Sequence, residues 1–115
     1  MATEDTQALL DRYFQLMGRG DDFTECCTTS VTWTTFDDGT QVQGREPVRN
    51  LIEALHDKMH DAQTRKLVCA DDGAYLEGDC ADASGRSQER LAYCVAYDVA
   101  DGQITAMRLY GAVGR

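Results

Sequence analysis

Apolar residues between Leu9 and Met17 recur at intervals of three and four positions, the spacing that places side chains on one face of an α-helix. Gly18 and Gly20 end this pattern, so the sequence predicts an N-terminal helix with a broad apolar face. The segment 21–27, DDFTECC, predicts a helical turn or short second helix that begins at one of its two aspartates. The apolar face of the first helix consists of Leu9, Leu10, Tyr13, Phe14, Leu16 and Met17.

The pattern changes to β-branched and aromatic residues in Val31–Phe36, which predicts a strand, and Asp38-Gly39 after it is typical of a hairpin turn. A short second strand should follow and lead into a long helix through Gly-Arg-Glu, with Pro47 in its first turn. A single apolar stripe at helical spacing indicates the face that this helix buries. The stripe consists of Val48, Leu51, Ile52, Leu55 and Met59.

Turn signals and strand patterns alternate over the rest of the chain. Turns are expected at Asp72-Gly73, Ser84-Gly85 and Asp101-Gly102. Two or three helices followed by strands joined through tight turns predict an α+β fold, in which a strongly bent, mostly antiparallel sheet packs on the helices as one domain over residues 1–115. The expected strands are Lys66–Ala70, Ala74–Ala81, Gln88–Asp98 and Gln103–Tyr110.

The composition narrows the possible partners and the expected location. A formal net charge of −9 disfavours nucleic acids and anionic membrane surfaces, because both are bound through Lys and Arg. No apolar run is long enough to span a bilayer, and the acidic N-terminal segment lacks the basic region of a signal peptide. We therefore expect a cytoplasmic protein that contacts neither nucleic acid nor membrane.

The five cysteines give no sign of a metal site or a disulfide framework. Their number is odd and none forms a CxxC pair. Three of them, Cys69, Cys80 and Cys94, fall inside predicted strands, where a free cysteine is usually a small buried apolar residue. No metal and no cofactor are expected.

Three stretches, taken with this order of elements, are similar to those of a known family. They are RYFQLMGRGD, VQGREPVRNLI and YDVADGQITAMRLYG. Together they resemble the NTF2-like superfamily, and within it the SnoaL-like and ketosteroid-isomerase-like group, over essentially the whole chain. The resemblance implies a conical α+β barrel whose curved sheet wraps the long helix and leaves an apolar cavity open at one end. It also implies a homodimer through the outer face of the sheet. The superfamily includes isomerases, cyclases, dehydratases, epoxide hydrolases and non-catalytic binders, so the fold alone does not define the chemistry.

In the ketosteroid-isomerase branch, a carboxylate base moves a proton while a tyrosine and a protonated acid hold the enolate oxygen. The resemblance places the oxyanion-binding tyrosine at Tyr13, the protonated acid at Tyr93 and the base at Thr35. A threonine with an ordinary pKa cannot abstract a carbon-bound proton, so steroid isomerase activity is not expected. A shift of one or two residues in the loop after this strand would bring Asp37 to the site instead of Thr35. The segment Asp37-Asp38-Gly39 equally fits a solvated hairpin.

Side chains alternate across a strand, so an inward Thr35 implies inward Val31 and Trp33, and Tyr93 shares its face with Leu91, Val95 and Tyr97. An apolar lining with a few hydroxyl groups suits a small apolar ligand, although the aromatic side chains could equally fill the cone. On the last strand the alignment points Thr105, Met107 and Leu109 inward, and Ile104, Ala106, Arg108 and Tyr110 outward. The candidate substrate-binding residues are Trp33, Thr35, Leu55, Tyr97, Met107 and Leu109.

The general base has three candidates, Asp37, His56 and Glu89. His56 and His60 are four positions apart and could share one side of the long helix, but a solvated helix edge explains them as well. His56 becomes relevant if it leans into the mouth of the cavity, because its ordinary pKa suits proton transfer near neutral pH. Glu89 lies on the same predicted face as Tyr93 near a strand end.

Two functions from different classes remain open. The first is a SnoaL-like enzyme, of isomerase, cyclase, dehydratase or epoxide-opening type, that acts on a small apolar metabolite. In it Tyr13 and Tyr93 bind the substrate oxygen, an electrostatic contribution that usually dominates such reactions. The second is a non-catalytic ligand-binding or dimeric assembly domain that uses the same cavity, which the missing carboxylate at Thr35 favours.

Overall fold

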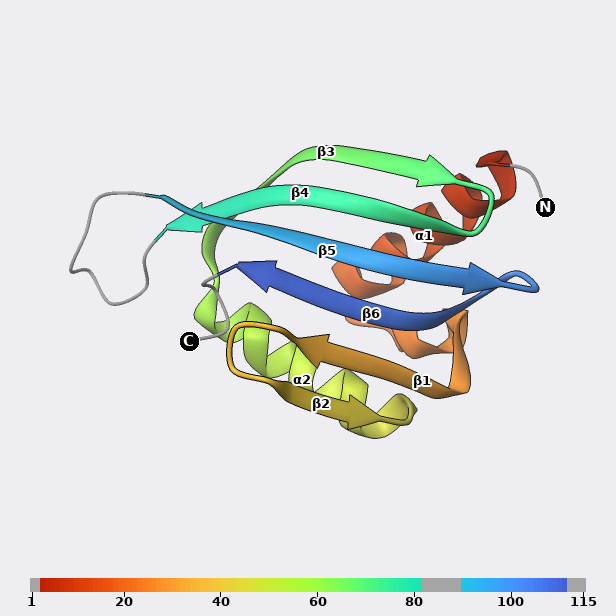
Figure 1. Cartoon of the computed structure of the whole chain (residues 1–115), viewed down its shortest axis with the longest axis horizontal. Helices are drawn as coiled ribbons and strands as arrows, with labels where there is room; N and C mark the ends of the chain where they lie inside the picture. The colour runs from red at the N-terminus through yellow and green to blue at the C-terminus, as the bar shows by residue number, and fades with distance from the viewer. Residues whose placement is uncertain (1–2, 82–89, 112–115) are drawn as a thin grey trace.

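The computed structural model of the chain describes residues 3–81 and 90–111. Within these ranges, α1 and η1 come first, a pair of strands and the helix α2 follow, and four long strands come last (Figure 1). This order confirms the predicted α+β class. The elements are α1 Thr3–Gly18, the short 3-10 helix η1 Phe23–Cys26, β1 Cys27–Thr35, β2 Thr40–Gln43, α2 Arg45–Lys58, β3 His60–Ala70, β4 Gly73–Ala81, β5 Arg90–Ala100 and β6 Gln103–Gly111.

The strands form one curved, unclosed sheet in the order β2-β1-β6-β5-β4-β3. Neighbouring strands are antiparallel except for β1 and β6, which are parallel. Helices α1 and α2 lie on the same face of this sheet, and within the described ranges the opposite face carries no helix (Figure 1). The predicted bent, mostly antiparallel sheet packed on helices is therefore confirmed, with β2 and β3 as its open edges.

The apolar faces of the two helices account for their packing. Helix α1 buries Leu10, Tyr13 and Leu16, and α2 buries Val48 and Ile52, each at helical spacing. The sheet contributes the other side of one core, which is where most of the free energy of apolar burial is gained. Its buried residues include Val31, Trp33, Leu76, Val95, Tyr97, Val99, Met107 and Leu109.

Two predicted local structures have the expected geometry. The side chain of Asp22 caps η1 by accepting a hydrogen bond from the backbone N–H of Thr24 at 3.0 Å. In the turn between β1 and β2, Gly39 has φ of 76° and its N–H donates to the carbonyl of Thr35 at 2.9 Å. That left-handed conformation favours glycine, so the Asp-Gly signal identified this turn for a physical reason.

The boundary between α2 and β3 differs from the prediction. Helix α2 ends at Lys58, and β3 begins at His60 rather than at the expected Lys66. The polar segment between these positions has no alternating apolar pattern, so its pairing with β4 left no signal in the sequence. His56 therefore lies in the last turn of α2 while His60 is the first residue of β3, and the two do not share a helix face.

The expectation that Ile104 points outward is wrong, because Ile104 is fully buried in the core. The pairing of β5 with β6 shifts register at this point: Asp98 pairs with Ala106 and Val99 with Ile104, which leaves Thr105 without a partner in the ladder. The hydroxyl of Thr105 donates instead to the carbonyl of Asp98 at 3.3 Å. One extra residue in a strand reverses which side chains face the core, and alternation alone cannot reveal it.

Some expectations lie outside the described residues, namely the turn at Ser84-Gly85 and the first residues of the strand expected from Gln88. Strand β1 begins at Cys27, earlier than the expected Val31. Among the described residues, no helix has both the length and the apolar character needed to cross a membrane.

Candidate functional site

A cavity of about 360 Å³ lies between the sheet and the two helices. Its inner part is lined by buried residues such as Tyr13, Trp33 and Leu109, each at most 3% exposed. Its outer part is lined by His56 at the end of α2 and Thr64 near the start of β3, and both of these residues are exposed. The cavity therefore opens to solvent between α2 and β3.

The structure brings most of the predicted site residues together around this cavity. Of the others, Thr35 and Met107 are buried but do not line it, while Asp37 is exposed in the turn after β1 and also lies outside the lining. Glu89 is outside the described residues. The predicted residues in the lining are Tyr13, Trp33, Leu55, Tyr93, Tyr97 and Leu109.

Thr35, which stands at the expected position of a base, is used to fix Trp33. The indole Nε1–H of Trp33 donates to the hydroxyl of Thr35 at 2.9 Å, and both side chains are buried. The two residues are two positions apart on β1, so they point to the same face of the strand, as the alternation predicts. The threonine orients a cavity-lining aromatic ring, and its oxygen does not face the cavity.

Tyr13 belongs to an aromatic cluster at the inner end of the cavity. Its ring meets Phe23 edge-on at a centroid distance of 5.6 Å and Tyr97 at 6.0 Å. Its hydroxyl donates to the Met107 sulfur at 3.5 Å, and a thioether is a weak acceptor. Burial raises the pKa of both Tyr13 and Tyr97, so each keeps its proton at neutral pH and acts as a hydrogen-bond donor.

Tyr93 lines the cavity farther out, where it lies across a glycine of the neighbouring strand. It pairs with Gly78 of β4, and a Cβ atom at that glycine would lie 2.7 Å from the Tyr93 hydroxyl oxygen. The absence of a side chain at Gly78 therefore makes room for the ring. Burial raises the pKa of Tyr93 as well, so this hydroxyl is also protonated at neutral pH.

His56 is the side chain in the lining that can change protonation near neutral pH. Packing around the imidazole lowers its pKa, while the carboxylates of Asp57 and Glu53 act in the opposite direction. A lowered pKa keeps the ring neutral at pH 7, the form that accepts a proton. Among the described lining residues there is no carboxylate, so His56 is the candidate general base that the geometry retains.

Sequence reasoning missed several lining residues. Phe14 and Met17 lie on the apolar face predicted for the first helix, and Leu76 follows from alternation in β4, so a signal for these three was present. Ala62 and Thr64 lie in the polar start of β3, where no apolar pattern marked a strand. The outer wall of the cavity was for that reason not predictable.

The described residues hold no group of three or more His, Cys, Asp or Glu side chains that could bind a metal ion. Of the three strand cysteines, Cys80 is buried, and Cys69 and Cys94 are partly buried. Burial raises the pKa of Cys27 to about 12, which keeps that thiol protonated and unreactive.

The family model for the SnoaL-like domain matches residues 10–107 of the chain. The chain belongs to the SnoaL-like domain family. No curated protein sequence matches it. The match begins within α1 and ends within β6, and it includes all of α2 and of β1–β5, so every element that lines the cavity is matched at least in part.

Solved structures of low sequence identity share the fold. The chain is similar to a steroid delta-isomerase of Pseudomonas aeruginosa, with a TM-score of 0.79, 12% identity, and 94% of this chain and 80% of that chain covered. It is similar to a candidate SnoaL-like polyketide cyclase of Mesorhizobium loti, with a TM-score of 0.69, 17% identity, and coverage of 91% and 97%. A de novo designed protein with a curved β-sheet has a TM-score of 0.76, 15% identity, and coverage of 97% and 88%.

Proposed function

We propose that the chain is a SnoaL-like enzyme that transfers a proton within a small, neutral, largely apolar molecule carrying a carbonyl group. The observation that supports it is the cavity of about 360 Å³, whose lining combines apolar side chains with three tyrosines and one histidine of lowered pKa. Apolar pockets of this size with a few convergent polar groups are typical of small-molecule sites. The described lining contains no Lys or Arg, which disfavours a negatively charged ligand.

The proposed chemistry uses the tyrosines and the histidine in different roles. The neutral imidazole of His56 takes a proton from the carbon next to the carbonyl, and the C–H electron pair moves into an enolate. Tyr13 and Tyr97 are protonated, and their hydroxyls donate to the enolate oxygen as its charge develops. For Tyr13, that bond replaces the weak one to the sulfur of Met107. When the ketone also carries a β,γ carbon–carbon double bond, the enolate is conjugated with it. Return of the proton from His56 to the γ-carbon then re-forms the carbonyl, shifts the double bond and completes an isomerisation.

A second candidate is a non-catalytic binder that uses the same cavity. It is favoured by the absence of a carboxylate from the described lining and by the bond that occupies the Thr35 hydroxyl. The two functions differ in one measurable property. A binder is stabilised by its ligand according to mass action but leaves the carbon–hydrogen bonds of that ligand unchanged.

The test uses a panel of neutral apolar ketones that fit the cavity, in deuterated buffer, with hydrogen exchange at the carbon beside the carbonyl followed by proton NMR. Replacing a general base costs about 10²–10⁴-fold in rate, so His56→Gln should lose at least about 100-fold. Because the reactive form of His56 is neutral and its pKa is lowered, the wild-type rate should rise with pH and level off, with a midpoint below the ordinary pKa of a histidine.

The chain offers a matched control in its second histidine. His60 is exposed at the start of β3 and does not line the cavity. The His60→Gln variant should therefore catalyse hydrogen exchange at the ligand carbon at the wild-type rate. Equal rates for wild type and His56→Gln would contradict the proposed base. Ligand-dependent thermal stabilisation of the wild type without any exchange would favour the binder.

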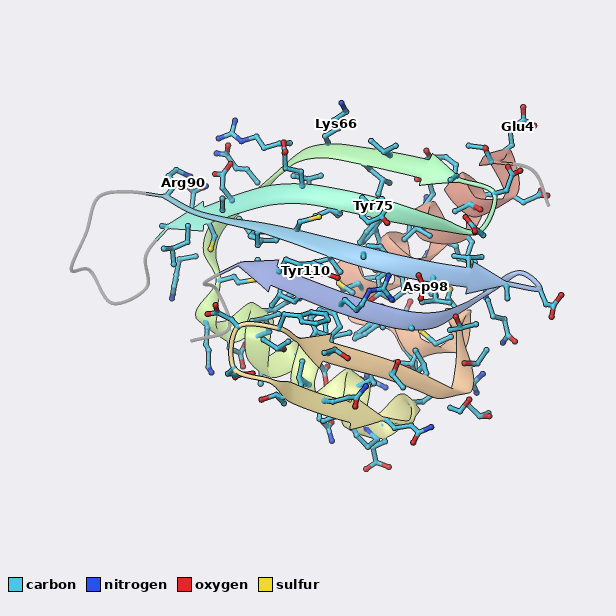
Figure 2. The ribbon with its side chains drawn as sticks, viewed as in Figure 1. Glu4, Lys66, Tyr75, Arg90, Asp98 and Tyr110 are labelled. Carbon is cyan, nitrogen blue, oxygen red and sulfur yellow. The ribbon has the colours of Figure 1, made fainter. Side chains whose placement is uncertain are left out.

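We also propose that the chain forms a homodimer through the face of the sheet that points away from the helices. The large apolar residues that are exposed in the described chain all lie on this face. The charged groups on the same face balance locally, since Arg108 pairs with Asp98 at 2.7 Å. Figure 2 shows Tyr75, Tyr110 and Asp98 on this side of the sheet. The exposed apolar residues are Phe36, Val68, Tyr75 and Tyr110.

A further inference from the structure

The first residues of β3, His60–Arg65, form the outer wall of the cavity but are weakly held by the sheet. We call them the rim segment. β3 is an edge strand, and its pairing with β4 shifts register both before and after Gln63–Thr64. Ala62 and Thr64 line the cavity while remaining exposed to solvent. The rim segment therefore has few of the contacts that fix the rest of the sheet.

The backbone of the rim segment also contains an unfavourable conformation. Asp61 has φ of 51°, in the left-handed region that residues with a Cβ atom rarely adopt. Aspartate tolerates this region better than most residues, but the conformation still costs free energy unless neighbouring contacts stabilise it. The contacts that do so come from a strand on the far side of β4.

Arg90, the first residue of β5, reaches across β4 and holds Asp61 at two points. Its Nη2–H donates to the backbone carbonyl of Asp61 at 2.6 Å, and its Nη1–H donates to the Asp61 carboxylate at 2.8 Å. The guanidinium also binds Asp79 of β4, which in turn binds Arg65 at the end of the rim segment. Figure 2 shows Arg90 at the start of β5, near the end of β4.

The charged groups of this network are strongly coupled. Hydrogen bonds from Arg65 and Arg90 lower the pKa of Asp79 to about 2, so its carboxylate stays ionised throughout the neutral range. The network lies on the outer face of the sheet, behind the wall of the cavity, since Asp79 follows Gly78, the glycine on which Tyr93 packs, and side chains alternate across a strand. The rim segment is thus attached to the sheet by its interrupted pairing with β4 and by these ionic contacts, with little apolar packing of its own.

We propose that Arg90 is a latch that holds the rim segment across the mouth of the cavity, and that release of its bonds to Asp61 admits and frees the ligand. The inference rests on the proposed function, because a gate matters only for a cavity that binds something. Exposed ion pairs contribute little individually and are screened by salt, so the latch opens without disturbing the core. Segments of low local stability are the ones that open in this way.

The test compares Arg90→Gln with the control Arg12→Gln, which removes the exposed ion pair between Arg12 and Glu25 on α1 and η1. Hydrogen–deuterium exchange measures opening directly and needs no ligand. We expect amides of the rim segment to exchange about fivefold to tenfold faster in Arg90→Gln, as loss of a few exposed ionic contacts allows. Amides of Val95–Tyr97 in β5 should keep wild-type protection, and Arg12→Gln should match the wild type throughout.

A second measurement follows access to the cavity with N-phenyl-1-naphthylamine, a neutral apolar fluorophore, in stopped-flow mixing. In Arg90→Gln both the association and the dissociation rate constants should rise about fivefold, with a smaller change in Kd, since the gate affects both directions alike. Raising NaCl to about 1 M, where the Debye length is about 3 Å, should reproduce this effect in the wild type. Asp61→Asn keeps the carbonyl contact and should give a smaller increase.

Unchanged exchange in the rim segment of Arg90→Gln would overturn the latch. Faster exchange spread over β4 and β5 would also overturn it, because Arg90 would then hold the fold as a whole. A wild-type cavity that binds no neutral apolar probe contradicts the proposed function instead, and exchange in the rim segment still decides the question of the latch.

Discussion

At the scale of single residues, the site depends on how Thr35 is used. The sequence resemblance led us to expect a catalytic carboxylate at this position, which raises the question of what Thr35 does instead. In the structure its hydroxyl accepts the indole N–H of Trp33 at 2.9 Å, so the residue has a structural partner within the same strand. Thr35 therefore fixes the orientation of one aromatic wall of the cavity.

Replacing Thr35 by valine keeps the shape of the side chain and removes the acceptor. The buried N–H of Trp33 then lacks a partner, and leaving a buried donor unsatisfied costs about 1–3 kcal/mol of unfolding free energy. Urea unfolding followed by the fluorescence of Trp33, the single tryptophan of the chain, measures this directly. Thr34→Val is the matched control on the other face of β1, and we expect little change there. A Thr35→Val protein as stable as the wild type would contradict this account of the pair.

The residues that sequence reasoning placed around the cavity were found where strand alternation is regular. Trp33, Tyr93 and Tyr97 follow from alternation along β1 and β5, and all three line the cavity. Thr35 shares the inward face but is not part of the lining, and its hydroxyl accepts the indole N–H of Trp33. Their roles in binding or catalysis stay predictions. Asp37 lies in an exposed turn, the outcome that the Asp-Gly signal favours.

At the scale of elements, turns and amphipathic helices were predictable, and irregular strands were not. Asp-Gly turns require a backbone conformation that few other residues adopt, so they mark hairpins reliably. The rim segment His60–Arg65 is polar and interrupted by register shifts, and it contains no periodic signal. The misplaced Ile104 has the same cause, since the irregularity at Thr105 reverses the faces of β6 and has no signature in the residues themselves.

Gly78 of β4 leaves the space in which the Tyr93 ring packs against the wall of the cavity. A Cβ atom there would meet the Tyr93 ring at 2.7 Å and the Gln63 carbonyl oxygen at 2.9 Å. Gly78→Ala should therefore displace the Tyr93 ring or the backbone of β3, at a cost of about 1–3 kcal/mol, the usual range for an overpacked site. Thermal and urea unfolding measure the loss, and the affinity for a neutral apolar fluorophore should fall with it.

Gly18→Ala is the control for this substitution. No atom lies within 4 Å of the position where its Cβ would be, and Gly18 is the last residue of α1. Alanine there should leave the unfolding free energy unchanged or raise it slightly, because it restricts the unfolded chain. Equal stabilities for Gly78→Ala and the wild type would mean that Tyr93 is free to move, and that Gly78 does not position it.

At the scale of the whole molecule, the chain is strongly acidic, yet the large apolar residues exposed in its described part gather on one face of the sheet. The chain carries a net charge of −9, which favours solubility and opposes association. The outer face of the sheet departs from this pattern. There Phe36 and Tyr110 stack at a centroid distance of 4.8 Å, and Tyr75 is 58% exposed beside Val68, its partner in the ladder. Contiguous exposed apolar groups of this kind mark an interaction surface.

The proposed homodimer can be separated from a general effect of charge. Tyr75→Lys with Tyr110→Lys places two cations on the apolar face and changes the net charge from −9 to −7, which by itself would reduce repulsion between copies. We expect the wild type to sediment at twice the chain mass of 12.7 kDa and the double variant to sediment as a monomer, because buried unpaired charges are costly. Gln15→Lys with Asn50→Lys makes the same change of charge on the exposed sides of α1 and α2 and should remain dimeric. A monomeric wild type, or a dimeric Tyr75→Lys/Tyr110→Lys variant, would exclude this face as the interface.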